Sequence, residues 1–203
     1  MTGSAPFRNS ADAVPKSSGA HIVVSGGRPI ALTGFMASGK STIGKLLASS
    51  LGLEFMDLDL LIERKTGTSV AEIFSRDGEA AFRKLELSAL AECTMISHPF
   101  ILACGGGMLT LPEARSILAR SYLRIWLDCP LEVILDRLVS HDTERCSRPL
   151  ASGRSWESRL AALYEDRREI YKQNCDIAFD IRSGESAEES ALRLSALVRG
   201  LAS

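Results

Sequence analysis

The chain has 203 residues, of which 45% are hydrophobic and 24% charged, and its formal net charge is -1. This length and composition are typical of one globular domain with an apolar core. The near-neutral charge and the lack of a basic stripe argue against a nucleic-acid binder, and no apolar run approaches the length of a membrane span.

The five cysteines form no CxxC pair, and their number is odd. This pattern is typical of free thiols in a reducing compartment, and it does not resemble a disulfide framework or a zinc site. Residues 1–27 are rich in Ser, Gly, Ala and Pro and lack the apolar segment of a secretory signal, so we expect a disordered N-terminal tail. We therefore expect a cytoplasmic monomer in which residues 28–203 form a single domain, with neither nucleic acid nor membrane as a partner.

Short apolar runs alternate with amphipathic stretches along the chain, a pattern that predicts βαβ units around a parallel sheet. The predicted strands are Ile30–Thr33, Glu54–Met56, Phe100–Cys104, Leu123–Leu127 and Ile177–Phe179. The predicted helices are Gly39–Ser50, Leu60–Lys65, one that begins near Ser69, Glu79 to about Met95, one that opens at Pro112, Leu131–Val139, Ser155–Lys172 and Ala187–Leu201. Right-handed crossovers would place these helices on both faces of a five-stranded sheet.

The first predicted strand leads into Gly34-Phe-Met-Ala-Ser-Gly-Lys-Ser41, which fits the pattern GxxxxGK[ST] between a strand and a helix. In such a loop the backbone N–H groups and the helix N-terminus surround a phosphate. Lys40 can reach the β- and γ-phosphates of a nucleotide, and Ser41 can offer its hydroxyl to Mg²⁺. A chance match in a glycine-rich turn is the alternative, but strand, loop and helix are all in order.

Asp57 and Asp59 follow the second predicted strand, and ligands of open α/β sheets bind outside the carboxyl ends of the strands. One carboxylate could orient Mg²⁺ through a water molecule while the other accepts a hydroxyl proton from the acceptor. Asp59 could also serve both purposes, or it could simply cap the helix that begins at Leu60.

Arg83 and Glu86 are three residues apart on a predicted helix and so share a face. A surface ion pair is the usual meaning of this spacing, and such pairs contribute little stability. The functional alternative is an arginine that faces a substrate anion and is oriented by the glutamate.

Three glycines, Gly105, Gly106 and Gly107, come directly after the third predicted strand. They either form a plain tight turn or allow the backbone to approach a ligand closely. Further along, the polar stretch 139–155 carries several arginines, among them Arg148. It is either a solvated loop or a mobile lid that closes over ATP and excludes water.

Together these features resemble the shikimate kinases, in the segments GFMASGKSTIG, DLD, EIFSRDGEAAFRKLE, GGG, RPL and RREIY. The resemblance covers roughly residues 29–180. It implies a three-layer α/β P-loop kinase fold of the nucleoside-monophosphate-kinase type, with a five-stranded parallel sheet, helices on both faces and a mobile lid. It also implies ATP-dependent phosphorylation of the 3-hydroxyl of shikimate, with Mg²⁺ as the cofactor.

The resemblance assigns roles to individual residues. It places the phosphate cradle at Ala37, Ser38, Gly39, Lys40, Ser41 and Thr42, and the Mg²⁺ ligands at Ser41 and Asp57. It places the base and a contact to the shikimate hydroxyls at Asp59. It places the remaining acceptor contacts at Phe74, Phe82, Arg83, Gly105, Gly106, Gly107 and Arg167. It gives Arg148 of the lid a contact to ATP and places Arg137 beside the adenine.

Two residues depart from the family pattern. Ala37 replaces a glycine, which costs roughly 1 kcal/mol if the position needs a positive φ. Cys104 precedes the glycines where a Thr or Leu is expected, and a buried cysteine there should act as a small apolar residue. The nearest rival enzyme is a gluconate-type sugar-acid kinase of the same fold. A rival of another class is a regulatory module that binds ATP without transfer, but Lys40, Ser41, Asp57 and Asp59 are all intact.

Overall fold

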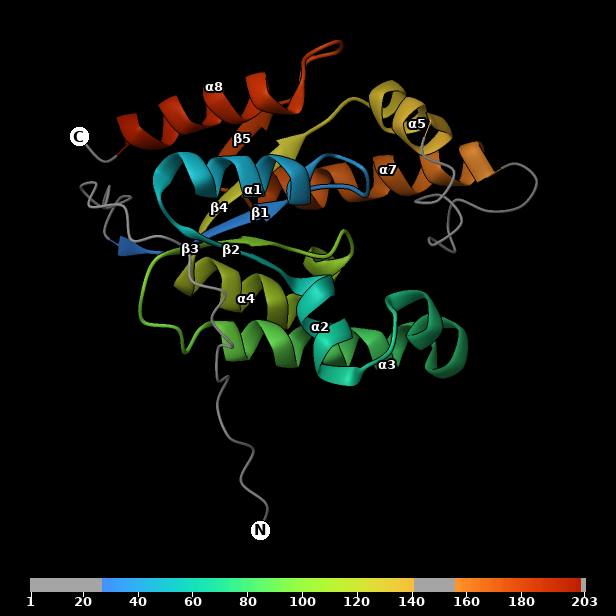
Figure 1. Cartoon of the computed structure of the whole chain (residues 1–203). Coiled ribbons are helices and arrows are strands. Elements are labelled where there is room, and N and C mark those ends of the chain that lie inside the picture. The colour runs from blue at the N-terminus through green and yellow to red at the C-terminus, as the bar shows by residue number, and fades with distance from the viewer. Residues whose placement is uncertain (1–26, 141–155, 202–203) are drawn as a thin grey trace.

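The computed structural model describes residues 27–140 and 156–201 (Figure 1). Five strands form one parallel sheet in the order β2-β3-β1-β4-β5. The strands are β1 (Ile30–Thr33), β2 (Glu54–Asp57), β3 (Phe100–Ala103), β4 (Leu123–Asp128) and β5 (Ile177–Asp180). Each strand predicted from the sequence is confirmed, with ends that differ by at most one residue.

Apolar composition explains the middle of the sheet. Every residue of β1 and β3 is buried, because helices cover both faces of these two strands. Parallel strands covered on both faces read as continuous apolar runs rather than as alternating ones. This is the reason that the runs at Ile30–Thr33 and Phe100–Ala103 identify strands so clearly.

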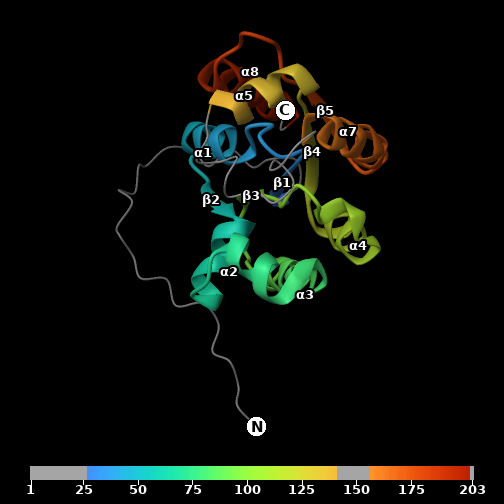
Figure 2. The same cartoon turned by 90° about the vertical axis from the view of Figure 1, so that its right-hand side faces the viewer.

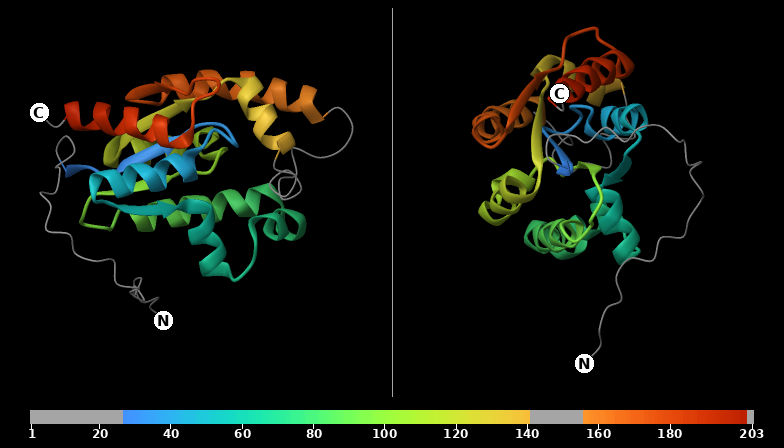
Figure 3. Two further views of the ribbon diagram at one scale, coloured as in Figure 1. Left: turned by 45° about the horizontal axis from the view of Figure 1, so that its top comes forward. Right: turned by 90° about the vertical axis from the view of Figure 1, so that its left-hand side faces the viewer.

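The helices form a layer on each face of the sheet. They are α1 (Lys40–Leu51), α2 (Leu58–Thr66), α3 (Val70–Cys93), α4 (Pro112–Ser121), α5 (Leu131–Ser140), α7 (Trp156–Gln173) and α8 (Ala187–Gly200), with a short 3₁₀ helix, η2, at Met108–Thr110. Helices α1 and α8 pack against each other on one face, while α3, α4 and α7 lie on the other (Figure 2). Both views in Figure 3 show the same three layers, which confirms the predicted α/β arrangement. No helix in the described part of the chain combines the length and apolar character needed to cross a membrane.

Local sequence signals set several helix boundaries. Pro112 is at the first position of α4, as predicted. Ser69 caps α3 by accepting a hydrogen bond from the N–H of Glu72. The two helices that we predicted on either side of Gly78 are both present: they follow each other within α3 and are separated by a kink at Gly78, whose φ of 81° and ψ of 172° are not helical.

The register of the strands brings distant segments to the same edge of the sheet. Asp57, at the end of β2, pairs with Ala103 of β3, and Leu32 of β1 pairs with the same Ala103. The segments that follow these strands therefore emerge at one level. This edge holds the loop 34–39, the aspartates around α2 and the glycine triplet.

Candidate active site

The segment 34–39 forms a tight loop between β1 and the N-terminus of α1. Ala37 within it has φ 55°, which is the left-handed region that a Cβ disfavours. The positive φ suspected from the sequence at this position is therefore confirmed. Ser38, also in this loop, is fully buried, and its N–H donates to the Phe35 carbonyl at 3.3 Å. The loop thus has a fixed shape at the positive end of a helix dipole.

Lys40 folds back along this loop. Its Nζ donates to the carbonyls of Gly34 at 3.0 Å and Phe35 at 2.6 Å. These bonds hold an ammonium group beside the backbone N–H groups of the loop. A phosphate chain in the loop would meet this charge directly.

Ser41 and Asp57 meet across the edge of the sheet, where Ser41 Oγ donates to Asp57 Oδ2 at 2.5 Å. The other carboxylate oxygen of Asp57 accepts from the N–H groups of Asp59 at 3.1 Å and Leu60 at 3.4 Å, which makes Asp57 the N-cap of α2. The helix cap that we considered at Asp59 is therefore wrong by two residues. The hydroxyl and carboxylate oxygens of Ser41 and Asp57 are hard donors of the kind that Mg²⁺ prefers, so this pair fits a Mg²⁺ site.

A cavity of about 310 Å³ opens at this edge of the sheet. The predicted residues that line it are Ala37, Gly39, Lys40, Ser41, Thr42, Asp57, Asp59, Gly106 and Arg137. The structure thus brings the phosphate loop together with the aspartates and the middle glycine. Asp59 and Gly106 lie in the same cavity as the loop, as expected of groups that would face an acceptor beside a nucleotide.

Arg83 and Glu86 form a buried pair, so the interpretation as a surface ion pair is wrong. The Arg83 side chain is 14% exposed and the Glu86 side chain 0%, and Arg83 Nη1 donates to Glu86 Oε2. Arg83 Nη2 also donates to Glu79 at 2.7 Å. Burial raises the pKa of Glu86 to about 7, although the adjacent Arg83 acts to lower it. The spacing of three residues revealed the shared helix face but could not show that Gly105 and Gly107 pack against it.

The glycine triplet is packed against this pair. A Cβ at Gly105 would overlap Glu86 Oε1, and a Cβ at Gly107 would overlap the Arg83 guanidinium. Any larger residue at either position would have to displace one member of the pair. The close approach seen at Gly105 and Gly107 is therefore to the Arg83–Glu86 pair, and approach of the triplet backbone to a ligand stays a prediction.

Arg167 reaches the triplet from α7 and is 9% exposed. Its Nη1 donates to the Gly106 carbonyl at 3.1 Å, while its Nε is buried without a hydrogen-bond partner among the described residues. Tyr171, one turn further along α7, donates its hydroxyl to the same carbonyl. Tyr171 ends the segment RREIY, but no role was predicted for it; its spacing of four residues from Arg167 was a further available signal.

The two predicted aromatic walls, Phe74 and Phe82, are in contact, with ring centroids 4.7 Å apart. Phe82 is buried in the core beneath Arg83, whose guanidinium lies 5.7 Å from the ring centroid. Phe74 is only partly buried. Of the two, Phe74 is therefore the ring with surface left to offer a ligand.

Arg137 of α5 closes the cavity beside the phosphate loop, where its Nη1 donates to the Ala37 carbonyl at 2.9 Å. Ala187, the first residue of α8, lines the cavity as well and was not predicted. The predicted lid arginine, Arg148, lies outside the described residues, as does nearly all of the stretch 139–155.

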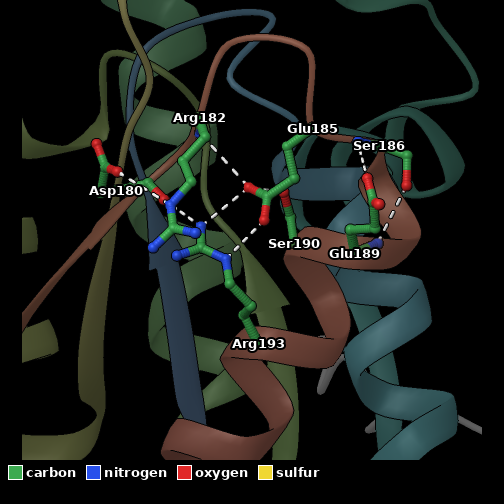
Figure 4. A network of polar contacts seen from close by, with 7 residues as sticks. All are labelled: Asp180, Arg182, Glu185, Ser186, Glu189, Ser190 and Arg193. Carbon is green, nitrogen blue, oxygen red and sulfur yellow. Dashed lines mark hydrogen bonds and ion pairs between the residues drawn. The ribbon is translucent and has the colours of Figure 1, made fainter.

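A polar network holds the segment that leads to Ala187 (Figure 4). Arg193 donates to both carboxylate oxygens of Glu185, at 2.6 and 2.9 Å, and to the Asp180 carbonyl at 2.6 Å. Ser186 and Glu189 form a full capping box at the start of α8. These bonds tie the end of β5 to the first two turns of α8 and so fix Ala187 at the cavity wall.

The parallel sheet in the order β2-β3-β1-β4-β5, with a phosphate loop after β1 and a Ser–Asp pair beside it, defines a phosphotransferase with the P-loop kinase fold. Residues 36–198 match the family model of shikimate kinase, and the chain belongs to the shikimate kinase family.

Individual relatives support this assignment. The shikimate kinase of Synechococcus elongatus is 42% identical over 168 residues, which cover 83% of this chain and 85% of that protein. The shikimate kinase of Geobacter sulfurreducens is 42% identical over 177 residues, covering 87% of this chain and 94% of that protein. A solved structure of shikimate kinase from Acinetobacter baumannii in complex with shikimate matches with a TM-score of 0.78 and 32% identity, covering 88% of this chain and 96% of that one.

Proposed function

We propose that the chain transfers the γ-phosphoryl group of ATP to the 3-hydroxyl of shikimate. The observation that carries this proposal is the position of Asp59 and Gly106 in the same cavity as the phosphate loop. A phosphoryl donor in the loop and an acceptor against Gly106 would face each other across Asp59. Membership in the shikimate kinase family makes shikimate the preferred acceptor over gluconate.

The phosphate loop would hold the β- and γ-phosphates through its backbone N–H groups and through Lys40. Ser41 and Asp57 would hold Mg²⁺, which when bound supplies charge neutralisation at the phosphates. Lys40 adds a second positive charge where negative charge develops during transfer. Arg148 would add a third positive charge from the lid. Arg137 would lie beside the adenine, in the cavity that Ala187 also lines.

The acceptor carboxylate would bind Arg83 and Arg167. Both guanidinium groups can present a planar pair of donors, and Arg167 Nε is a buried donor with no partner among the described residues. Glu86 would orient Arg83, to which it is already hydrogen-bonded. Phe74 would contact the ring, and Gly106 would approach it through the backbone.

Asp59 would accept the proton of the 3-hydroxyl as that oxygen attacks the γ-phosphorus. The hydroxyl oxygen forms the new P–O bond, the bond from the γ-phosphorus to the β,γ-bridging oxygen breaks, and ADP leaves with the electron pair. We further propose that residues 28–203 form one kinase domain with its lid at 139–155, and that the protein is a cytoplasmic monomer.

The test is a coupled assay of ADP release with ATP, Mg²⁺ and either shikimate or gluconate. Wild type should turn over shikimate, while Lys40→Ala should lose nearly all turnover and keep its fold, as judged by circular dichroism. A wild-type enzyme that uses gluconate and ignores shikimate would contradict the acceptor. A Lys40→Ala variant with wild-type turnover would contradict the phosphate loop.

A further inference from the structure

Tyr171 lies behind the glycine triplet and is held from two sides. Its hydroxyl donates to the Gly106 carbonyl, and its ring stacks on Trp126 of β4, with centroids 6.2 Å apart and an interplanar angle of 23°. The side chain is almost completely buried. The hydroxyl is therefore fixed relative to both α7 and the sheet.

Gly106 differs from its two neighbours in how its carbonyl is bound. The Gly105 carbonyl accepts from the N–H of Met108 at 3.1 Å, and the Gly107 carbonyl accepts from the N–H and the hydroxyl of Thr110 at 3.0 and 2.7 Å, all within the local turn. The Gly106 carbonyl instead accepts from two side chains of α7, those of Arg167 and Tyr171. Since a peptide unit is planar, holding this carbonyl also fixes the direction of the Gly107 N–H.

The position of Gly106 is critical because it lies against the phosphate loop. A Cβ built on Gly106 would lie 3.3 Å from the backbone N of Met36 and 3.7 Å from the Gly34 carbonyl oxygen. The peptide of Gly106 thus sits between the loop on one side and the donors of α7 on the other. A change in its orientation would alter the acceptor side of the cavity.

We infer that Tyr171 is a positioning residue that keeps the Gly106 peptide in place, so that Arg167 can bind the carboxylate of the acceptor. This inference rests on the proposed function, which gives Arg167 two partners: the Gly106 carbonyl and the substrate carboxylate. When Arg167 turns toward the substrate, the Tyr171 hydroxyl keeps the carbonyl bonded. Burial raises the pKa of Tyr171 to about 12, so the hydroxyl remains a donor throughout the pH range of an assay.

The test is Tyr171→Phe, which keeps the ring and its contact with Trp126 and removes only the hydroxyl. We expect the KM for shikimate to rise about tenfold, the effect of one lost hydrogen bond, while the KM for ATP stays within about twofold. The shift should appear as a split between the two Michaelis constants, which a purely structural role would not produce.

Two other buried tyrosines provide matched controls. Tyr164, also on α7, donates its hydroxyl to the Cys129 carbonyl at 3.1 Å, so Tyr164→Phe loses a bond of the same kind away from the triplet. The Tyr122 hydroxyl is buried with no hydrogen-bond partner in the described ranges, so Tyr122→Phe removes a hydroxyl without removing a bond. Both variants should keep the wild-type KM for shikimate, and Tyr164→Phe should lower the melting temperature.

If Tyr171→Phe behaves like Tyr164→Phe, with lower stability and an unchanged KM for shikimate, the inference is overturned. Should Tyr171→Phe fail to fold, Trp126→Phe is the second variant, because it retains the Tyr171 hydroxyl but reduces the surface on which the Tyr171 ring stacks. The KM for shikimate should again rise. An unchanged KM for shikimate in Trp126→Phe would also overturn the inference. If wild type does not phosphorylate shikimate, the proposed function fails first, and this inference falls with it.

Discussion

Ser41 Oγ donates to Asp57 Oδ2 at 2.5 Å, although Ser41 lies in the first turn of α1, after β1, and Asp57 ends β2, and these two strands are not neighbours in the sheet. The contact spans the end of β3, and it is possible because Leu32 of β1 and Asp57 of β2 pair at the same level of that strand. The pair that fits a Mg²⁺ site is thus assembled by strand register. The same carboxylate caps α2, so the proposed metal site and the start of the helix depend on one side chain.

Asp57→Asn separates these two roles, because Asn caps a helix about as well as Asp but lacks the charge. We expect the Mg²⁺ concentration for half-maximal rate to rise about tenfold or more, with little change in melting temperature. Asp57→Ala is the matched comparison, since it also removes the cap at a cost of about 0.5–2 kcal/mol. An Asp57→Asn enzyme with the wild-type Mg²⁺ dependence would show that Asp57 is only a cap.

Asp59→Asn tests the proton acceptor. The amide keeps the shape of the side chain but cannot take the hydroxyl proton, so turnover should fall by at least about 10²-fold. Binding of ATP, measured by calorimetry without acceptor, should be unchanged. Turnover within a few-fold of wild type would leave Asp59 as a binding residue for the acceptor hydroxyls.

The fold was largely predictable from the sequence because the buried parallel strands β1 and β3 are short apolar runs bounded by turn residues. The phosphate loop was predictable for a related reason, since its chemistry depends on backbone and on a fixed local spacing. Helix limits were clear wherever a capping residue or a proline at the first helical position marks them, as Ser69 and Pro112 do, respectively.

Other features depend on tertiary contacts and could not be predicted locally. Nothing near Glu86 in the sequence indicates that Gly105, 19 positions further along the chain, packs on its carboxylate. The partner of Tyr171 lies 65 residues away, at a backbone carbonyl that has no side-chain signal. The cap at Asp57 rather than Asp59 follows from where α2 begins, and a sequence pattern predicts the existence of a helix more reliably than its ends.

Ala37→Gly tests the one strained position of the loop. With φ at 55°, the Cβ of Ala37 is unfavourable, and its removal should raise the free energy of unfolding by up to about 1 kcal/mol. The KM for ATP should change by less than about threefold, because the loop bonds to phosphate through its backbone. Ala37→Val is the opposing control: a β-branched residue at this φ should destabilise the protein. Equal stability of the Gly and Val variants would contradict the assigned conformation.

Arg83→Lys tests the shape of the carboxylate site. A lysine keeps the charge but not the planar pair of donors, so the KM for shikimate should rise strongly. The corresponding loss of binding free energy should approach the about 2–5 kcal/mol expected for removing one member of a buried charged pair. The KM for ATP should be nearly unchanged. Arg76→Lys on the same helix is the control, since Arg76 pairs with Asp77 and its side chain is 62% exposed. A loss of ATP binding with shikimate binding intact would place Arg83 in the nucleotide site.

Glu86→Gln tests the buried carboxyl through the pH dependence of stability. Burial raises the pKa of Glu86 to about 7 from an ordinary value of 4.5. Between these two values the folded protein holds a proton that the unfolded chain has released, so the stabilising effect of this raised pKa is complete below pH 4.5 and is lost as the pH rises toward 7.

Wild type should therefore lose stability relative to Glu86→Gln as the pH increases across this range, by on the order of 1 kcal/mol per pH unit. Denaturant unfolding of both proteins at several pH values between 5 and 8 measures the difference. Parallel stability curves for the two proteins would mean that Glu86 is ionised throughout, held by Arg83. In that case the Glu86 carboxylate would stay charged beside Arg83, the arginine proposed to bind the carboxylate of the acceptor. Titration of Glu86 should then cause no pH dependence of the KM for shikimate.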